Sequence, residues 1–474
     1  MKKRLIWIPI LSILLFSCQH KLRFFSDKVI ALDLPDIEKR GSIIVATSNN
    51  ASDYFLYKGE PNGFQLELLE DFGNYLGLKV DVIVCNNPSE NLALLHRGEC
   101  DLLASSWNNL SSTDDKYTTG SIPFYNSNLV LVQKRLKIPG NVPYKSNKQG
   151  LIAQVVSLKG KTVYVPFMSA QAEVMHELAN ELQGNIHVVE LPQYTQEKLV
   201  ELVAEGELEY TICNSILAES LKKQFEQLDF SFVVKKAEPI AWTFRKSSTK
   251  FAEKLNKWII GYKKTTRFAL LIDKYFNKDS HWGVTNNQYV AYKEAKISAY
   301  DDLIKKYSSD INWDWRLLAA LIYQESRFKP NVKSHRGAYG LMQMMPSTQE
   351  YFGIDSTASP EQQIKAGVKY IKFLDRSFEK RIPDPLERIN FILASYNVGP
   401  GHIFDAQKLA GKLGKNPLKW FNNVDTCLLS KSNPDNYNDP QVQFGYCKGV
   451  ETFSFVSEII NRFKHYKNVL KEGK

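Results

Sequence analysis

The spacing of hydrophobic and polar positions changes along the chain. In the first half, short apolar runs alternate with stretches in which apolar residues have helical spacing. Apolar runs such as SIIVAT (42–47) and KTVYVPF (161–167) are short and rich in β-branched residues, which predicts buried strands. Between such runs, as over 64–76 and 170–182, apolar residues recur at helical spacing. Strands that alternate with helices predict βαβ units and a parallel sheet. We therefore expect two α/β lobes over residues 41–277, with a cleft that can close on a ligand.

Residues 295–474 have a helical period over most of their length. Apolar side chains at helical spacing predict a helix over 360–378. The Asp-Pro pair at 384–385 is typical of a helix start, and we expect the helix that follows to end at Gly399. The sequence therefore predicts a second, all-helical domain, joined to the α/β part by a linker over 278–294.

One predicted helix of this second domain ends on a carboxylate, Glu325. Apolar residues lie three, four, seven and eight positions before it, so Glu325 falls on the buried stripe of the helix. Desolvation at such a position raises the pKa of a carboxyl group, which suits a group that donates and then accepts a proton near neutral pH. The alternative is a structural glutamate paired with Arg327 or Arg336.

The segment after Glu325 is expected to turn back beside it. Pro330 ends the helix, and Gly337 and Gly340 allow tight turns before the run LMQMM enters a new helix at Pro346. This geometry would place a wall next to the carboxylate.

The N-terminus predicts export. Basic residues at 2–4 precede an apolar run over 5–16, which is too short to span a bilayer comfortably and is typical of a secretory signal over 1–17. The net charge of +10 fits an exported protein that meets anionic cell-wall polymers and lipid surfaces, and a solvated surface explains it nearly as well. We find no nucleic-acid-binding motif, so nucleic acid is not expected as a partner.

Cysteine spacing leaves several arrangements open. Beyond Cys18 there are five cysteines, and in an exported protein Cys427 with Cys447, and Cys85 with Cys100, are candidate disulfides, with Cys213 left over. No CxxC pair or histidine cluster has the spacing of metal ligands, so we expect neither a metal nor a cofactor.

Two motifs of the helical domain carry a family resemblance. The segment ESRFKPNVKSHRGAYGLMQMMPST (325–348) and the later ASYNVGPGH (394–402) resemble the soluble lytic transglycosylase family. The resemblance implies a lysozyme-like α-helical domain that cleaves the glycan strands of peptidoglycan. It also implies that Glu325 is the catalytic acid.

By position, the same resemblance assigns five substrate-binding residues. Ser334 and Gln343 would bind sugar or acetamido groups, Met345 would line the cleft, and Tyr396 would hold Glu325 or the substrate, with Asn397 beside it. For Met345, simple core filling is the alternative.

The family's chemistry needs one carboxylate, whereas hydrolysis with retention or inversion ordinarily uses two. Glu325 would protonate the oxygen between N-acetylmuramic acid (MurNAc) and N-acetylglucosamine (GlcNAc). It would then take the proton of the muramic C6 hydroxyl as a 1,6-anhydro ring closes. Neither Asp314 nor Glu350 lies at a motif position for a second acid. A lysozyme-type hydrolase and an inert cell-wall receptor remain the alternatives.

The α/β part resembles the family-3 extracellular solute-binding proteins, through GFQLELLEDFGNYLGLKVDV (63–82), GECDLLAS (98–105) and LKGKTVYVPFMSAQAEV (158–174). The resemblance implies a regulatory ligand site with Lys116, Ser169 and Asn214 as candidates. Lys116 stands where the family commonly has an arginine, and lysine lacks the bidentate fork that grips a carboxylate. Asn214 stands where an aspartate commonly meets an amino group. A small ligand and a ligand-free scaffold are therefore both open.

The end of the export signal, LFSC (15–18), resembles the lipobox of bacterial lipoproteins. It implies that Cys18 is lipidated and begins a linker over 18–40, and Gln19 favours the outer membrane. An ordinary signal peptide or a plain anchor is the alternative. The whole arrangement resembles membrane-bound lytic murein transglycosylases, which implies peptidoglycan glycan strands as substrate, a muropeptide or small ligand in the front module, and a membrane contact through the lipid.

Overall fold

The computed structural model describes residues 30–470, except 51–52, 106–115, 137–149, 168, 193, 223 and 277–295. The expected signal, Cys18 and the expected linker over 278–294 lie outside the described residues. In the described part of the chain, no helix is long and apolar enough to cross a bilayer.

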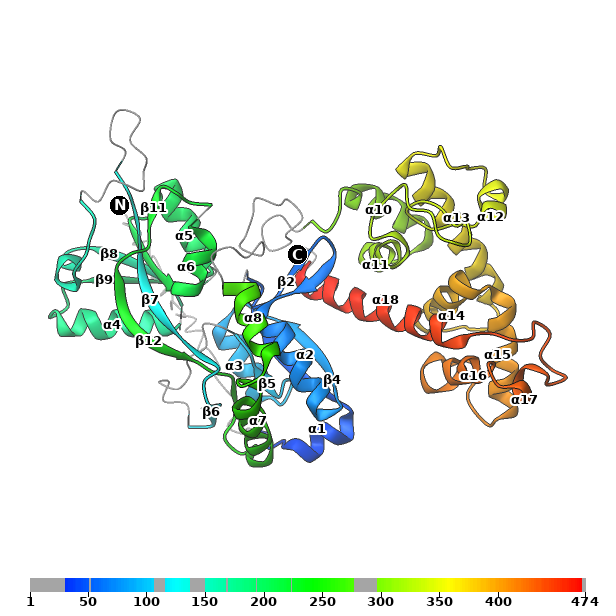
Figure 1. The fold of residues 1–474 in the computed structure, drawn as a ribbon, viewed down its shortest axis with the longest axis horizontal. Coiled ribbons are helices and arrows are strands. Elements are labelled where there is room, and N and C mark those ends of the chain that lie inside the picture. The colour runs from blue at the N-terminus through cyan, green and yellow to red at the C-terminus, as the bar shows by residue number, and fades with distance from the viewer. Residues whose placement is uncertain are drawn as a thin grey trace, which may run out of the picture.

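The first α/β lobe is built on a five-stranded mixed sheet of order β4-β1-β5-β13-β6. Figure 1 shows this lobe around the labels β4, β5 and β6. β1 (Ser42–Thr47) pairs in parallel with β4 (Lys79–Val84) and β5 (Leu102–Leu103). β13 (Thr243–Arg245) returns from far along the chain and runs antiparallel to β5 and to β6 (Thr118–Gly120). The predicted parallel sheet is therefore wrong for this edge, because a strand that re-enters the lobe from the other side arrives in the opposite direction.

Helices bury their apolar faces against this sheet. α2 (Phe64–Leu76), α7 (Thr249–Tyr262) and α8 (Thr266–Phe276) share one hydrophobic cluster with β1, and α3 (Pro88–His96) packs with β5 in a smaller cluster. The helix predicted over 64–76 is confirmed, with Phe64 and Phe72 buried.

An additional helix, α1 (Leu34–Arg40), lies in the stretch expected to be a linker. Asp33 caps it in a capping box with Asp36, and Ile37 on its inner face is buried. These two acids satisfy backbone N–H groups of the first turn, which is why a helix of only seven residues forms here.

The second lobe has a six-stranded sheet in which β12 (Val233–Ile240) also pairs with β7 (Tyr125–Lys134). Figure 1 shows these two long strands side by side between the lobes. The other strands are β8 (Thr162–Pro166), β9 (His187–Leu191), β10 (Tyr210–Asn214) and β11 (Leu228–Asp229). β10 is parallel to β8 but antiparallel to β7, so this sheet is mixed as well. Its helical segments are η2 (Val155–Leu158), α4 (Ala170–Glu181), α5 (Gln196–Glu205) and α6 (Ser215–Leu221).

The last part of the chain is helical around one large hydrophobic cluster. Its elements are α10 (Asp301–Ser308), η3 (Ser309–Ile311), α11 (Trp315–Ser326), α12 (Pro346–Tyr351), α13 (Pro360–Phe378), α14 (Pro385–Val398), α15 (Pro400–Lys412), η4 (Trp420–Val424), α16 (Asp425–Ser430), α17 (Pro434–Tyr437) and α18 (Gly449–Val469). The predictions for 360–378 and for a helix starting at 385 are confirmed. The sequence analysis missed α15, because Gly399 breaks one helix while Pro400 begins the next.

The five described cysteines are all buried, and none of them forms a disulfide with another. The candidate pairs Cys427 with Cys447 and Cys85 with Cys100 are therefore not disulfides in this structure. Cys85 and Cys100 belong to the same hydrophobic cluster, where they pack as small apolar side chains.

A hairpin of the first lobe docks on the helical domain. It consists of β2 (Phe55–Tyr57) and β3 (Glu60–Asn62), and its Leu56 is fully buried in the hydrophobic cluster of the helical domain. At the hairpin tip the Tyr466 hydroxyl donates to the carbonyl of Gly59 over 2.8 Å. Gly59 has φ +83°, and a Cβ there would lie within 2.8 Å of side chains of the helical domain, so only glycine permits this close approach.

Candidate active site

The last turn of α11 positions Glu325. Asp314 caps the start of this helix by accepting a hydrogen bond from Arg316 N over 3.0 Å. The leucines and alanines that lie between Arg316 and Glu325 are buried. The helix ends where Arg327 and Phe328 adopt left-handed backbone conformations, with φ of 51° and 59°. Glu325 is thus held at the point where the chain leaves the core.

The electrostatic surroundings of Glu325 favour the protonated form. Part of the residue is exposed, yet burial of its carboxyl group raises its pKa to about 8. Among the described residues, no charged neighbour contributes to this shift. Arg327 and Arg336 are both exposed, so the alternative of a structural ion pair finds no support in their positions.

The two other acids considered lie elsewhere. The Asp314 carboxylate is at the opposite end of α11, where Arg316 Nη2 approaches it to 2.6 Å. Glu350 is exposed on α12. Among the described residues, no group of three or more His, Cys, Asp or Glu side chains could hold a metal ion.

The loop after α11 is held by two of the predicted substrate-binding residues. Ser334 Oγ accepts a hydrogen bond from Ala338 N over 3.0 Å. The side-chain nitrogen of Gln343 donates to the carbonyls of Val332 and Gly340 over 2.8 and 2.9 Å. Because this nitrogen is engaged within the loop, the amide oxygen of Gln343 is the atom that could accept a bond from a sugar hydroxyl.

Tyr396 on α14 connects this loop to Glu325. Its hydroxyl donates to the carbonyl of Met342 over 2.7 Å. Burial first, and then the negative charge of Glu325, raise the pKa of Tyr396 far above its usual value. Met342 is buried and packs on Gly367, whereas Met345 is 42% exposed, so core filling describes the former and not the latter.

The side chain of Asn397 contacts α18 and not the loop that carries Ser334 and Gln343. It is exposed, and its side-chain oxygen accepts a hydrogen bond from Thr452 Oγ1 on α18 over 2.7 Å. The structure therefore places it as a tie between α14 and α18, one residue beyond Tyr396.

Sequence reasoning missed Tyr370 on α13, whose ring centroid lies 5.2 Å from that of Tyr396. Tyr370 is two residues after Val368 and one before Ile371, so it does not share the stripe of apolar residues that predicts this helix. Its closeness to Tyr396 becomes recognisable only when α13 and α14 are packed together.

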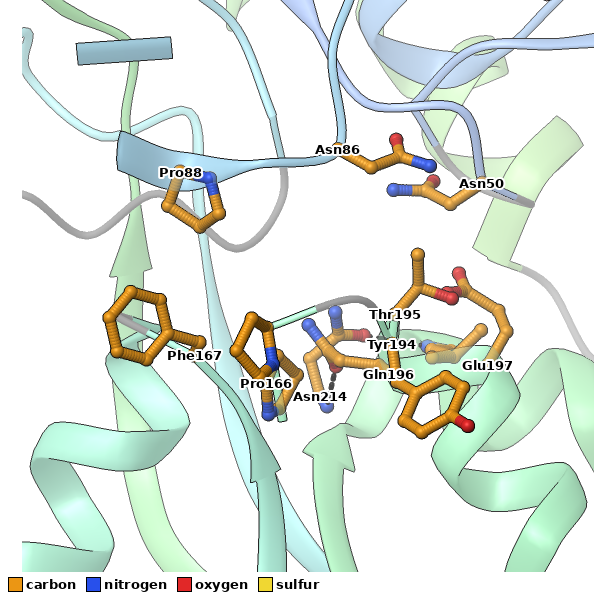
Figure 2. Close-up of a pocket in the computed structure, with 12 residues that line it drawn as sticks. Asn50, Asn86, Pro88, Pro166, Phe167, Tyr194, Thr195, Gln196, Glu197 and Asn214 are labelled. Carbon is orange, nitrogen blue, oxygen red and sulfur yellow. Dashed lines mark hydrogen bonds between the residues drawn. The ribbon is translucent and has the colours of Figure 1, made fainter. Parts of the chain in front are cut away.

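A second candidate site lies between the two α/β lobes (Figure 2). Asn50 and Asn86 come from the first lobe, and Gln196 and Asn214 face them from the second. The remaining lining residues are Pro88, Pro166, Phe167, Pro192, Tyr194, Thr195, Glu197 and Leu217. The amide side chains offer both donors and acceptors to a polar ligand.

The three predicted regulatory residues do not all meet there. Asn214 lines the pocket, and its side-chain oxygen also caps α6 by accepting from Leu217 N over 2.7 Å. The hydroxyl of Ser169 is engaged in capping α4 and in a 2.6 Å bond to the carbonyl of Pro166. Lys116 is exposed, with its ammonium group 5.0 Å from the centre of the Tyr117 ring. The three preceding residues, 113–115, lie outside the described part of the chain.

Comparison with known families accounts for both parts of the chain. Residues 43–278 match the bacterial extracellular solute-binding proteins, family 3, and residues 302–419 match the transglycosylase SLT domain. The predicted fold class, a two-lobed α/β domain followed by a lysozyme-like helical domain, is confirmed. These parts define a lytic transglycosylase that carries a solute-binding module.

Full-length relatives narrow this class to one family. A membrane-bound lytic murein transglycosylase F of Desulfosudis oleivorans is 29% identical over 446 residues, which are 92% of this chain and 92% of the relative. A protein of the same name from Shewanella pealeana is 30% identical over 428 residues, covering 89% of this chain and 84% of the relative. The chain belongs to the membrane-bound lytic murein transglycosylase F family. Among solved structures, an ancestral arginine-binding protein bound to arginine matches 50% of this chain and 99% of its own, with 19% identity and a TM-score of 0.42.

Proposed function

We propose that this enzyme cleaves the β-1,4 bond between MurNAc and GlcNAc of peptidoglycan without water, and leaves 1,6-anhydroMurNAc ends. The observation that supports this most is Glu325, a carboxyl group whose pKa of about 8 keeps it protonated at neutral pH and whose shift involves no second carboxylate among the described residues. A two-carboxylate hydrolase would need a second acid near Glu325, and no acid among the described residues contributes to the pKa shift of Glu325.

Glu325 serves in both halves of the reaction. It first donates its proton to the bridging oxygen as the bond to C1 of MurNAc breaks. The resulting carboxylate then takes the proton of the C6 hydroxyl, whose oxygen forms the new bond to C1. One proton leaves the acid and one returns to it, so the cycle closes without water.

The neighbouring side chains would position this acid and the sugar. Tyr396 lies close enough to Glu325 for the charge of Glu325 to raise the pKa of Tyr396. The hydrogen bond from the Tyr396 hydroxyl to the Met342 carbonyl fixes the tyrosine ring. Ser334 and Gln343 hold the loop and offer oxygen atoms to the acetamido or hydroxyl groups, and exposed Met345 offers an apolar contact. Asn397 supports α14 through its bond to Thr452.

Mass spectrometry of digested peptidoglycan tests the proposal. We expect anhydro ends from the wild type and a loss of cleavage by orders of magnitude for Glu325→Gln. Glu350→Gln, which alters an exposed acid on α12, is the matched control and should cleave normally. Reducing ends would instead indicate a hydrolase, and no product from the wild type would favour the inert receptor.

We further propose that the solute-binding module regulates this site. Asn50 in the pocket between the lobes exchanges two hydrogen bonds of 2.7 Å with Asp53, which leads directly into the docked hairpin. Tyr323, two residues before Glu325, bonds to Glu60 of that hairpin. A change at the pocket would therefore reach α11 through a short chain of contacts.

Thermal-shift measurements on the whole protein with amino acids and muropeptides would identify the ligand, which we expect to be a muropeptide or another small polar molecule. Asn214→Ala should abolish the shift, because that residue lines the pocket. Unchanged melting with every compound would favour a scaffold role.

We also propose that the protein is exported and anchored to the periplasmic face of the outer membrane through a lipid on Cys18, after removal of residues 1–17. The names of the relatives support a membrane location. Labelling with a palmitate analogue should mark the wild type but not Cys18→Ser, which should appear in the soluble fraction. An unlabelled wild type would indicate an ordinary signal peptide or a plain anchor.

A further inference from the structure

A row of aromatic rings leads away from the catalytic acid across α14, α13 and α12. The ring centroids of Tyr396 and Tyr370 are 5.2 Å apart, those of Tyr370 and Phe352 are 5.9 Å apart, and those of Phe352 and Tyr351 are 5.0 Å apart. Phe373, one turn along α13, stacks on Tyr370 at 6.4 Å. We call these five residues the aromatic row.

Exposure increases along the aromatic row. Tyr396, Tyr370 and Phe352 are partly buried and pack against the core of the helical domain. Tyr351 is 75% exposed and Phe373 is 47% exposed. Each of these exposed rings contacts a partly buried ring of the row, Tyr351 through Phe352 and Phe373 through Tyr370, so the rings form one continuous aromatic surface of the kind that marks an interaction site.

The aromatic row is continuous with the site of the chemistry. At the inner end of the row, the Tyr396 hydroxyl donates a hydrogen bond to the Met342 carbonyl, and the charge of Glu325 raises the pKa of Tyr396. A polymer that places one bond at Glu325 must extend over neighbouring surface in both directions, so a surface that begins at this ring suits the polymer itself.

The chemistry of the aromatic row fits a glycan strand. A pyranose ring has faces of C–H groups that pack on aromatic rings, and hydroxyl groups at its edge that stay in water. Exposed Lys369 and Lys372 lie on α13 between and beside Tyr370 and Phe373, where their charges can meet the carboxylates that peptidoglycan carries on its lactyl and peptide groups.

We propose that Tyr351, Phe352, Tyr370 and Phe373 form an extended sugar-binding surface that holds saccharide units remote from the cleaved bond. This inference rests on the proposed function, because the polymer that lies on the aromatic row is the one cut at Glu325. Binding there increases the affinity for long strands, whereas short fragments that do not reach Tyr351 and Phe373 gain nothing from it.

Binding to purified insoluble peptidoglycan provides the first test, made in the Glu325→Gln background so that the substrate is not consumed. We expect Tyr351→Ala combined with Phe373→Ala to weaken binding by roughly 10-fold, because each ring contributes an aromatic contact. Leu386→Ala, which removes an equally exposed apolar side chain from α14, is the matched control and should bind like the parent. Equal binding by the double variant would overturn the proposal.

Kinetics in the active enzyme provide the second test. The double variant should raise KM for long glycan strands while kcat stays close to the wild-type value, and Tyr351→Trp combined with Phe373→Tyr should restore KM. A fall in kcat with unchanged KM, or an equal rise in KM for a disaccharide substrate, would overturn the proposal. The binding assay does not depend on which product forms, so failure of the proposed reaction and failure of this surface give different results.

Discussion

At the scale of single residues, the protonation state of Glu325, the proposed proton donor, depends on its surroundings. Glu325 follows a run of buried leucines and alanines, and burial of its carboxyl group raises its pKa to about 8. In the folded protein the acid is therefore protonated at pH 7, while in the unfolded chain it would be ionised.

This shift predicts a pH dependence of activity. The form that starts the reaction is the protonated one, so kcat/KM should stay high at neutral pH and fall tenfold per pH unit well above pH 8. A pH profile on soluble glycan strands measures it. A decline already centred near pH 4 to 5 would mean that the carboxyl group has an ordinary pKa and would contradict the assignment.

At the scale of elements, a buried ion pair joins α15 to the end of α16. Lys431 and Asp405 are both fully buried, with Nζ and Oδ2 separated by 2.8 Å. Asp405 also accepts hydrogen bonds from the backbone of Gln443 and Phe444, so it fixes the segment between α17 and α18. Burial raises the pKa of Asp405, but these backbone bonds and the lysine together outweigh it and hold the pKa below its usual value.

Replacing one partner of this pair should be costly. Lys431→Met leaves the Asp405 charge buried without its cation and should lower the free energy of unfolding by about 3–5 kcal/mol. Lys408→Met is the matched control, because Lys408 reaches the same carboxylate at 3.9 Å from a position that is 38% exposed; we expect a loss of about 0–1 kcal/mol. Urea denaturation compares the two. Similar losses for both would show that burial is not what makes the pair important.

At the scale of the whole molecule, α18 joins the catalytic core to the first lobe. His465 on α18 is 7% exposed, and its Nδ1 lies 2.6 Å from the Tyr54 hydroxyl. Burial, together with nearby Arg462 and Lys464, lowers the pKa of His465 to about 4, while Asp81 acts in the opposite direction. The contact between the two domains therefore contains a neutral histidine at physiological pH.

The sign of this shift predicts loss of stability in acid. Between pH 4 and 6.5 the unfolded chain binds the His465 proton and the folded chain does not, so stability rises with pH across this window, by roughly 3 kcal/mol in all. His465→Gln cannot take up the proton, so the difference in unfolding free energy between wild type and variant should shrink as pH falls from 7 to 4.5. A difference that stays constant over this range would contradict the prediction.

The local sequence pattern predicted some elements closely. Other elements depend on neighbouring elements or on distant parts of the chain. The helix over 360–378 has regular apolar spacing and a capping box at Ser359, so its limits follow from residues within it. The helix α15 was missed, since the same Gly399 that ends α14 also precedes Pro400 at the start of α15. The direction of β13 depends on where the chain re-enters the first lobe, which no local pattern records.

The residues of the candidate sites also fall into two groups, those that one short segment identified and those that only the folded chain brings together. Glu325 was selected from its helical spacing, and Ser334 and Gln343 from the resemblance of the surrounding motif to the soluble lytic transglycosylase family, so one continuous segment was sufficient for all three. The neighbours of Tyr396, and the pocket that Asn50 shares with Asn214, come from segments far apart in the sequence. Lys116 was selected by position, but it lies exposed over Tyr117.

The sequence by itself determined the order of the two domains, the carboxyl group at the end of an apolar helix, and the family, because period and motif are properties of short stretches. Only the tertiary structure decided which strands are antiparallel, that the five described cysteines form no disulfide with one another, and that a hairpin of one domain packs beside the helix that carries Glu325. These features arise from contacts between distant segments, whose free energy depends on how the whole chain packs and not on the residues of any one segment.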